Sequence, residues 1–223
     1  MNPISDLLPS ALGIVASPMP LIAMLVLCII GVARTSGTFF LLGWFLGAFA
    51  SIALAVVFNT GDSGSTQNAP STAQIVMKFV VAFLLLYLAF NNWRTRPKPD
   101  DKISAPGWVD KLSKASVLPV FGIGMFLCVL NVKNLPLLLS AALTVSDASK
   151  SVVQGLIYDL IFSLMASFGL ALPWVITIFG GKNVKKSLES TRDWLFRYNN
   201  VIMAVLFLYL GLNSLAGAIS NIA

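Results

Sequence analysis

A lysine with two neighbouring asparagines lies inside a long apolar run, in the stretch Leu130–Pro136, which reads Leu-Asn-Val-Lys-Asn-Leu-Pro. A cation at bilayer depth costs at least ~2.5 kcal/mol, so it normally faces protein or a water-filled cavity. Its ammonium can donate three hydrogen bonds and attracts phosphate, sulfate or carboxylate groups. We therefore expect Lys133 to hold an anionic or polar head group, which Asn131 and Asn134 would orient.

The alternative role for Lys133 is a buried ion pair with Asp159, the only carboxylate clearly inside a predicted membrane span. The depths of the two residues differ by roughly 8 Å along their helices, a gap that a lysine side chain largely covers. Gln154 and Tyr158, four residues apart on one helix face, are expected to add a polar outer lining beside Asp159. Asp159 is thus a candidate for proton coupling or for a structural ion pair, and both remain open.

Prolines interrupt two of the apolar stretches, at Ser17-Pro18-Met19-Pro20 and at Pro136. Proline removes a backbone hydrogen bond and kinks a helix, and the freed carbonyls must find partners in protein or in a cavity. Corresponding interruptions in two halves of a chain indicate a transport site. We expect Ser17, Pro18, Pro20 and Pro136 to line or shape a substrate cavity with Lys133; a role in helix packing alone is the alternative.

The elements that position these residues are predicted to be membrane-spanning helices. Of the 223 residues, 57% are hydrophobic and 11% are charged, whereas a soluble domain carries about 25% charged residues. The apolar residues come in stretches of about 20, the length that crosses a hydrocarbon core. The chain is therefore expected to be an all-α polytopic membrane protein with six transmembrane helices. The predicted spans are 8–31, 37–59, 74–93, 117–145, 152–179 and 198–220.

The distribution of Lys and Arg predicts the orientation of these spans. The loop 60–73 contains neither residue, whereas the loops 94–116 and 180–197 contain most of the 15 in the chain. Placing these two loops and Arg34 in the cytoplasm leaves only Lys150 clearly outside, which gives an N-out, C-out topology. Topology thus accounts for the formal charge of +6 better than a nucleic-acid partner does.

An internal repeat relates the two halves of the chain. The pattern Leu-Tyr-Leu-x-x-Asn occurs at 86–91 and at 208–213, and the two proline interruptions match at a similar offset. Since each half has three spans, the second half would cross in the opposite direction, an inverted repeat common in secondary transporters. Chance similarity between Leu-rich helices is the alternative. The predicted division is 1–93 for the first repeat, 94–116 for a basic cytoplasmic linker and 117–223 for the second repeat.

The repeated pattern places Tyr87 with Asn91, and Tyr209 with Asn213, one helical turn apart on a shared face. These residues are expected to satisfy carbonyls freed by the prolines rather than to contact substrate. Separately, Gly43-x-x-x-Gly47 permits close approach of another helix. The segment 108–112 is expected to form a short interfacial helix.

Few residues are suited to redox or metal chemistry. The chain has no histidine, and its two cysteines, Cys28 and Cys128, lie in apolar runs without a Cys-x-x-Cys partner. A disulfide framework is therefore not indicated, and no metal, no cofactor and no enzymatic activity are expected. A thiol-relay oxidoreductase is the least favoured alternative function.

Together these motifs resemble the Sap/GAP family of sulfolipid- and glycopeptidolipid-addressing proteins, within the LysE transporter superfamily. The resemblance lies in Ala16–Ile22, in Arg34, in Leu42–Gly47 and in Leu130–Asn134. It implies a multi-pass protein of the inner (plasma) membrane of actinobacterial type that helps to move cell-envelope glycolipids outward. LysE-like amino-acid exporters usually carry Asn-Pro-Lys in the fourth span, where this chain has Val132 before the lysine.

The sequence therefore predicts a secondary transporter or flippase with its binding site between the first and fourth spans. The expected partners are membrane lipids and an anionic or glycosylated lipid substrate; a second copy of the chain and cytoplasmic lipid-synthesis enzymes are further candidates. Export of amino acids or small metabolites is the alternative transport function. A non-transporting membrane scaffold for lipid-synthesis enzymes is an alternative of another class.

Overall fold

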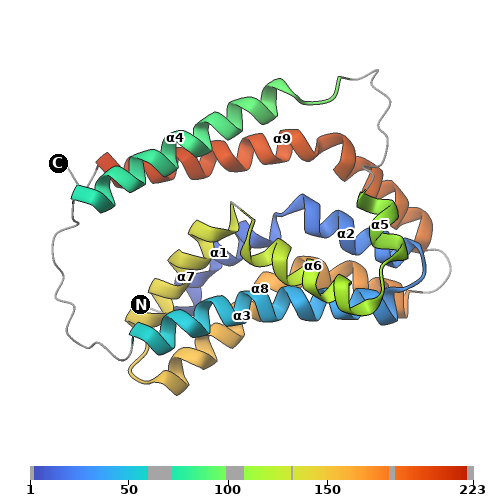
Figure 1. Cartoon of the computed structure of the whole chain (residues 1–223), viewed down its shortest axis with the longest axis horizontal. Coiled ribbons are helices and arrows are strands. Elements are labelled where there is room, and N and C mark those ends of the chain that lie inside the picture. Colours follow the sequence, from blue (N-terminus) through green and yellow to red (C-terminus); the bar gives the residue numbers. More distant parts are fainter. Residues whose placement is uncertain (1–2, 60–71, 99–107, 132, 181–183, 220–223) are drawn as a thin grey trace. The chain divides into compact units, whose positions relative to one another are not determined.

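A computed structural model of the chain describes residues 3–59, 72–98, 108–131, 133–180 and 184–219 (Figure 1). It is 90% helical, and strands are absent from the described part, which confirms the predicted all-α class. The helices are α1 (Pro3–Val15), α2 (Pro18–Ile29), the π-helical turn η1 (Ala33–Gly37), α3 (Thr38–Asn59), α4 (Thr72–Arg94), α5 (Trp108–Lys114), α6 (Val117–Val129), α7 (Asn134–Ala148), α8 (Val152–Phe179) and α9 (Val184–Ile219).

Several of these helices are long and apolar enough to cross a membrane. Three segments meet that criterion alone: Ala33–Leu54, Val152–Phe179 and Val184–Leu212. Two bent pairs meet it jointly, α1 with α2 at 63° and α6 with α7 at 74°, which gives up to five spans within the described residues. The chain is thus a multi-pass membrane protein. The remaining predicted span, 74–93, lies in α4, which is not among these, so six spans stay a prediction.

Two stretches predicted as basic loops contain helix. Trp108–Lys114 forms α5, as expected for the segment 108–112. The predicted loop 180–197 is mostly helical, because α9 begins at Val184 instead of near residue 198. The early start of α9 corrects the predicted boundary; its physical reason is that charged residues on one face of a helix lower the mean hydropathy without breaking the helix.

The chain forms two compact units. The first contains described residues of Met1–Ser63 and Ala105–Trp194, and the second contains those of Gly64–Ser104 and Leu195–Ala223. The first unit therefore holds every helix except α4 and the later part of α9. The predicted repeats at 1–93 and 117–223 concern similarity between the two halves of the chain, not compactness, and they stay a prediction. All residues predicted to bind substrate or to couple lie in the first unit.

Within the first unit, α3 and α6 pack backbone to backbone. A Cβ atom on Gly43 would lie 2.1 Å from the carbonyl oxygen of Phe121, and one on Gly124 would lie 2.3 Å from that of Phe40. A Cβ atom on Gly47 would lie 3.1 Å from the carbonyl oxygen of Met125. The Gly-x-x-x-Gly motif thus permits close helix approach, as its sequence predicts.

Helix α8 contacts α1, α2, α3 and α7 within the first unit. Two buried or half-buried indoles fix its register: Trp44 donates from Nε1 to the carbonyl of Ala166 at 3.2 Å, and Trp174 donates to that of Ala33 at 3.1 Å. Buried indole N–H groups normally find such partners. The buried face of α8, which carries Asp159, is therefore held against the broken helices.

In the second unit, α4 runs antiparallel to the later part of α9. Leu85, Ala89 and Phe207 form a buried cluster, and the Asn200 side chain donates to the carbonyl of Thr95 at 3.0 Å. Both tyrosines of the repeated pattern lie in this unit.

Candidate functional site

The two bent pairs break at similar places relative to their prolines. α1 ends at Val15 before α2 begins at Pro18, and α6 ends at Val129 before α7 begins at Asn134. Pro18 and Pro20 lie in the first turn of α2, and Pro136 lies in the first turn of α7. Proline is tolerated there because first-turn N–H groups have no intrahelical partner. The prolines therefore start the second helix of each pair instead of kinking a continuous one.

Lys133 lies at the second break and is fully buried, with 0% of its surface exposed. Its Nζ donates to the carbonyl oxygen of Gly13, in the last turn of α1. Carbonyls in the last turn of a helix lack intrahelical partners and carry partial negative charge, so they suit a cation. The hydrogen bond to Gly13 uses one of three ammonium donors, and among the described residues the other two have no partner.

Lys133 does not pair with Asp159 in this structure. Within the described ranges, no ion pair joins the two side chains at 4.0 Å or less, although both are fully buried. Of the two roles that the sequence left open, the ion pair is therefore not the one formed here. The amine instead binds a neutral backbone carbonyl, which leaves its charge uncompensated by a carboxylate.

Asn134 joins the two breaks. Its Oδ1 accepts a hydrogen bond from Ser17 Oγ at 3.3 Å, and its Nδ2 donates to the carbonyls of Cys128 at 3.0 Å and Leu127 at 3.4 Å. Ser17 precedes α2 and is 2% exposed, while Asn134 is fully buried. Asn134 thus satisfies carbonyls at the end of α6 and contacts the residue that precedes α2.

Asn131 shapes the connection between α6 and α7. Its side-chain Oδ1 accepts from the backbone N–H of Lys133 at 3.3 Å, and its carbonyl accepts from the N–H of Asn134 at 2.8 Å. Asn131 therefore positions Lys133 and Asn134 through the backbone. The structure brings together the breaks predicted from Ser17–Pro20 and from Lys133–Pro136 in one buried cluster.

Asp159 heads a ladder of polar side chains on the buried face of α8. Ser163 Oγ donates to Asp159 Oδ1 at 3.1 Å, and Ser167 Oγ donates to the carbonyl of Ser163 at 2.7 Å. Asp159 Oδ2 is buried and has no hydrogen-bond partner within the described structure. A buried, unpaired acceptor of this kind is costly, and it can take up a proton or a donor group.

Gln154 and Tyr158 form hydrogen bonds in the first turns of α8, before Asp159. Gln154 accepts at Oε1 from the backbone N–H of Lys150 at 2.9 Å, and its own N–H donates to Ser151 Oγ at 3.3 Å. Its Nε2 donates to the Tyr158 hydroxyl at 3.0 Å. The first two bonds cap the start of α8, where Ser151 is the N-cap residue. Ser163 adds a hydroxyl next to Asp159, and the polar lining expected from Gln154 and Tyr158 stays a prediction.

The tyrosines and asparagines of the repeated pattern belong to the second compact unit of the chain. Tyr87 is 65% exposed, Tyr209 is 64% exposed, and Asn91 is also exposed, all in the second unit. Within the first unit, carbonyls near the breaks accept from Lys133 and Asn134, and the role expected for the repeated residues at these carbonyls stays a prediction. The side chain of Asn213 lies outside the described ones.

Three residues that form hydrogen bonds with Lys133 or along the Asp159 face of α8 are not predicted from the sequence: Gly13, Ser163 and Ser167. The serines follow Asp159 at intervals of four residues, a spacing that could have identified them as sharing its helix face. Gly13 contributes only a backbone carbonyl, for which the sequence offers no signal.

The remaining candidate chemistry concerns thiols and metals. Cys28 and Cys128 are buried and not bridged, and Cys28 Sγ donates to the Pro173 carbonyl at 3.7 Å. In the described part of the chain, His, Cys, Asp and Glu form no group of three or more that could hold a metal ion.

Comparison with known proteins gives a family for this chain. Neither the curated proteins nor the solved structures gave a match to it. A model of the family described as "Sap, sulfolipid-1-addressing protein" matches residues 7–220, which include both helix breaks, Lys133 and Asp159. This match confirms the resemblance seen in the motifs at 16–22 and 130–134. The chain therefore belongs to the Sap, sulfolipid-1-addressing protein, family.

Proposed function

We propose that this protein is an inner-membrane secondary transporter or flippase that exports an anionic cell-envelope lipid, a glycolipid or its precursor. The observation that carries the proposal is Lys133, a fully buried lysine between two broken helices. The name of the family refers to a sulfolipid, and a sulfate group is the kind of anion that an ammonium binds. The substrate head group would take the two donors of Lys133 that have no partner in the described structure.

The first turns of α2 and α7 support Lys133 as the principal donor at this site. Helix N-termini attract anions through their free N–H groups, but Pro18, Pro20 and Pro136 carry none. The positive ends of the helix dipoles remain, so the field still favours an anion, and Lys133 supplies charged donors where the prolines reduce the number of backbone N–H groups. Asn131 and Asn134 would orient the head group after they release their present partners.

The buried position of Lys133 requires a second conformation in the transport cycle. A head group can reach Nζ only if α1 moves away from α7 near Gly13, where a Cβ atom would lie 2.8 Å from Leu137 Cδ1. Broken helices at the centre of inverted repeats commonly allow such rearrangements. The Gly13 carbonyl would then give up its hydrogen bond from Nζ to the substrate anion as the helices move.

Asp159 is proposed to couple transport to protons. Its buried Oδ2 can accept a proton without displacing Ser163 from Oδ1. We further propose the six-span, N-out, C-out arrangement with inverted repeats in the inner membrane. Its support is the positive-inside distribution of Lys and Arg and the similarity of the two proline breaks. As partners, a second copy of the chain and lipid-synthesis enzymes remain proposals.

The test compares lipid export by the native protein with that by Lys133→Gln and by the matched control Lys150→Gln, whose lysine is exposed. Each is expressed in a strain that lacks the native gene, and the lipids of the inner and outer leaflets are quantified. We expect Lys133→Gln to reduce outward movement of an anionic envelope lipid at least tenfold, while Lys150→Gln keeps normal movement.

Normal lipid movement by a folded Lys133→Gln variant would exclude Lys133 as the head-group site. If Lys133→Gln leaves the lipid content of both leaflets unchanged but abolishes export of an amino acid, the protein is an exporter of small metabolites. A scaffold would tolerate the loss of Lys133 and fail when the basic segments 94–116 and 180–197 are exchanged for neutral ones.

A further inference from the structure

A cavity of about 560 Å³ lies beside the first helix break. The function proposed above does not use it. Its volume falls within the range of ligand pockets, roughly 300–1,000 Å³. Val15 and Leu21, which flank the break, form part of its wall, and Leu172 and Ile176 of α8 form another part. The first turns of α9 complete it through Val184, Ser187, Leu188 and Thr191.

The start of α9 is amphipathic, and its cavity face is distinct from its charged face. The residues that line the cavity follow the spacing i, i+3, i+4, i+7, which forms one stripe of a helix. Lys185 and Lys186 lie between these positions and are exposed. The cavity is thus apolar along most of its wall and hydroxyl-bearing at the α9 side, next to two lysines.

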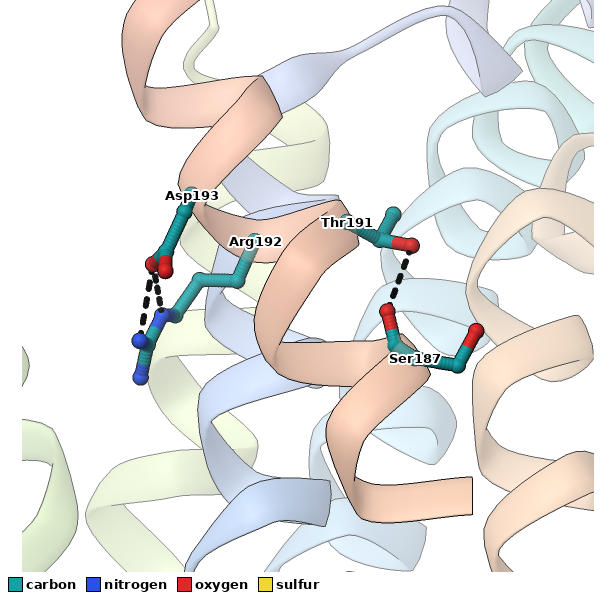
Figure 2. Close-up of polar contacts among 4 residues, drawn as sticks. All are labelled: Ser187, Thr191, Arg192 and Asp193. Atoms are coloured by element: carbon teal, nitrogen blue, oxygen red, sulfur yellow. Dashed lines mark hydrogen bonds and ion pairs between the residues drawn. The ribbon is translucent and has the colours of Figure 1, made fainter. Parts of the chain in front are cut away.

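The polar contacts on α9 show which groups are available to a ligand (Figure 2). Thr191 Oγ1 donates to the Ser187 carbonyl at 2.9 Å, so its proton is already used. Arg192 binds the Asp193 carboxylate at 2.7 and 2.9 Å, and this pair points to the other side of α9 from Thr191 (Figure 2). By contrast, the described structure gives Lys185 and Lys186 no carboxylate partner within 4.0 Å.

Along α8 the cavity covers about two-thirds of the hydrocarbon thickness of one leaflet. Its wall on α8 extends from Gly169 to Ile176, about 10 Å at 1.5 Å per residue, against about 15 Å for half of the hydrocarbon core. Its hydroxyl-bearing wall is formed by a helix rich in lysine, which the positive-inside rule assigns to the cytoplasmic side. An acyl chain that enters from that side would end near Val15, at the helix break.

We propose that this cavity binds one acyl chain of an anionic lipid of the cytoplasmic leaflet. Its head group lies beside the Ser187 hydroxyl at the first turn of α9, where the long side chains of Lys185 and Lys186 extend around the helix to reach it. The site is separate from Lys133 and holds lipid whether or not the protein transports it. Because its wall includes both sides of the α1–α2 break, a bound chain would stabilise the bent arrangement of these helices.

The experiment uses the full chain in phosphatidylcholine nanodiscs doped with a lipid that carries a photoreactive diazirine at the end of one acyl chain. The probe is phosphatidylglycerol in one sample and phosphatidylcholine in the other, and adducts are mapped by mass spectrometry of peptides. We expect adducts on Val15, Leu21 and Leu172 with the anionic probe, in several-fold excess over the zwitterionic one. Each lysine near a membrane surface favours an anion on the order of fivefold.

Three variants separate this site from ordinary surrounding lipid. Lys185→Gln combined with Lys186→Gln should abolish the preference for the anionic probe, whereas the control Arg192→Gln should keep it. Ser187→Trp should fill the cavity and reduce adducts from both probes, and circular dichroism checks that the helical content is retained. Ser187→Leu is a milder second variant, which should reduce the adducts less. Equal labelling by the two probes, or labelling that Ser187→Trp leaves unchanged, would overturn the proposal. Neither outcome depends on transport through Lys133.

Discussion

Ser17 and Asn134, separated by 117 positions in the chain, share a buried hydrogen bond of 3.3 Å between Oγ and Oδ1. The bond connects the residue before α2 with the first residue of α7, so one contact joins both helix breaks. Asn134 also closes the end of α6 through the Cys128 carbonyl. The arrangement of the cluster therefore depends more on Asn134 than on any other of its uncharged side chains.

Asn134→Ala should destabilise the protein more than Ser17→Ala does. The first change leaves two carbonyls and a serine without a partner, at about 2–3 kcal/mol, whereas the second removes one neutral hydrogen bond, at about 1 kcal/mol. Thermal unfolding of the full chain in detergent measures both, and the double variant measures their coupling. Equal losses for the two single variants would show that the carbonyls at the end of α6 find other partners.

Gly124→Ala should destabilise the packing of α3 on α6. Its new Cβ would lie 2.3 Å from the Phe40 carbonyl oxygen, and backbone cannot move aside as a flexible side chain can, so we expect a loss of about 1–3 kcal/mol. Gly122→Ala is the matched control in the same helix, because nothing lies within 4 Å of its added Cβ. The control should be neutral or slightly stabilising, since alanine favours helix by ~1 kcal/mol over glycine. Similar unfolding temperatures for both variants would contradict the close contact.

Lys133→Met should separate stability from transport. Methionine fills a similar volume without burying a charge, and apolar replacement of buried charged groups is often neutral or stabilising. We expect the unfolding temperature in detergent to stay the same or rise while lipid export is lost. A large fall in unfolding temperature would mean that the hydrogen bond to Gly13 is chiefly structural.

Asp159→Asn should remove the response of export to a pH gradient. Asparagine can still accept from Ser163 but cannot take up a proton, so folding should be retained while the coupling fails. Lipid movement is measured in proteoliposomes with and without an imposed gradient, and Ser163→Ala serves as the comparison that keeps the carboxylate. Export that still responds to the gradient in Asp159→Asn would exclude this carboxylate as the carrier.

The sequence predicts the helical class and the two breaks because both follow from local chemistry. Apolar runs of membrane length form helices because the bilayer core offers the backbone no other hydrogen-bond partners, and proline favours the first turn of a helix, so Pro18, Pro20 and Pro136 mark places where a new helix begins. The start of α9 is harder to locate, because Lys185, Lys186 and Arg192 give that segment the composition of a loop, although its apolar positions keep a helical period. A hydropathy average along the chain does not detect the apolar face of this amphipathic segment.

The details of the site are less predictable, because they depend on which surfaces meet. The sequence marks Asn134 as a substrate ligand but gives no sign of its hydrogen bonds with Ser17, Cys128 and Leu127, which depend on how the helices pack. Proximity in the chain associates Gln154 with Asp159, whereas the bonds of Gln154 form a cap at the start of α8. A polar residue near a functional group in the chain can serve a local backbone need instead.

The partner of Lys133 also bears on how the family can vary. Gly13 offers a backbone carbonyl, which every amino acid at that position would still present, so no single substitution there can delete the acceptor. The size of the residue at position 13 is restricted, because a Cβ on Gly13 would lie 2.8 Å from Leu137 Cδ1. Among relatives we therefore expect positions 13 and 137 to covary in volume, with a bulkier residue at one accompanied by a smaller residue at the other.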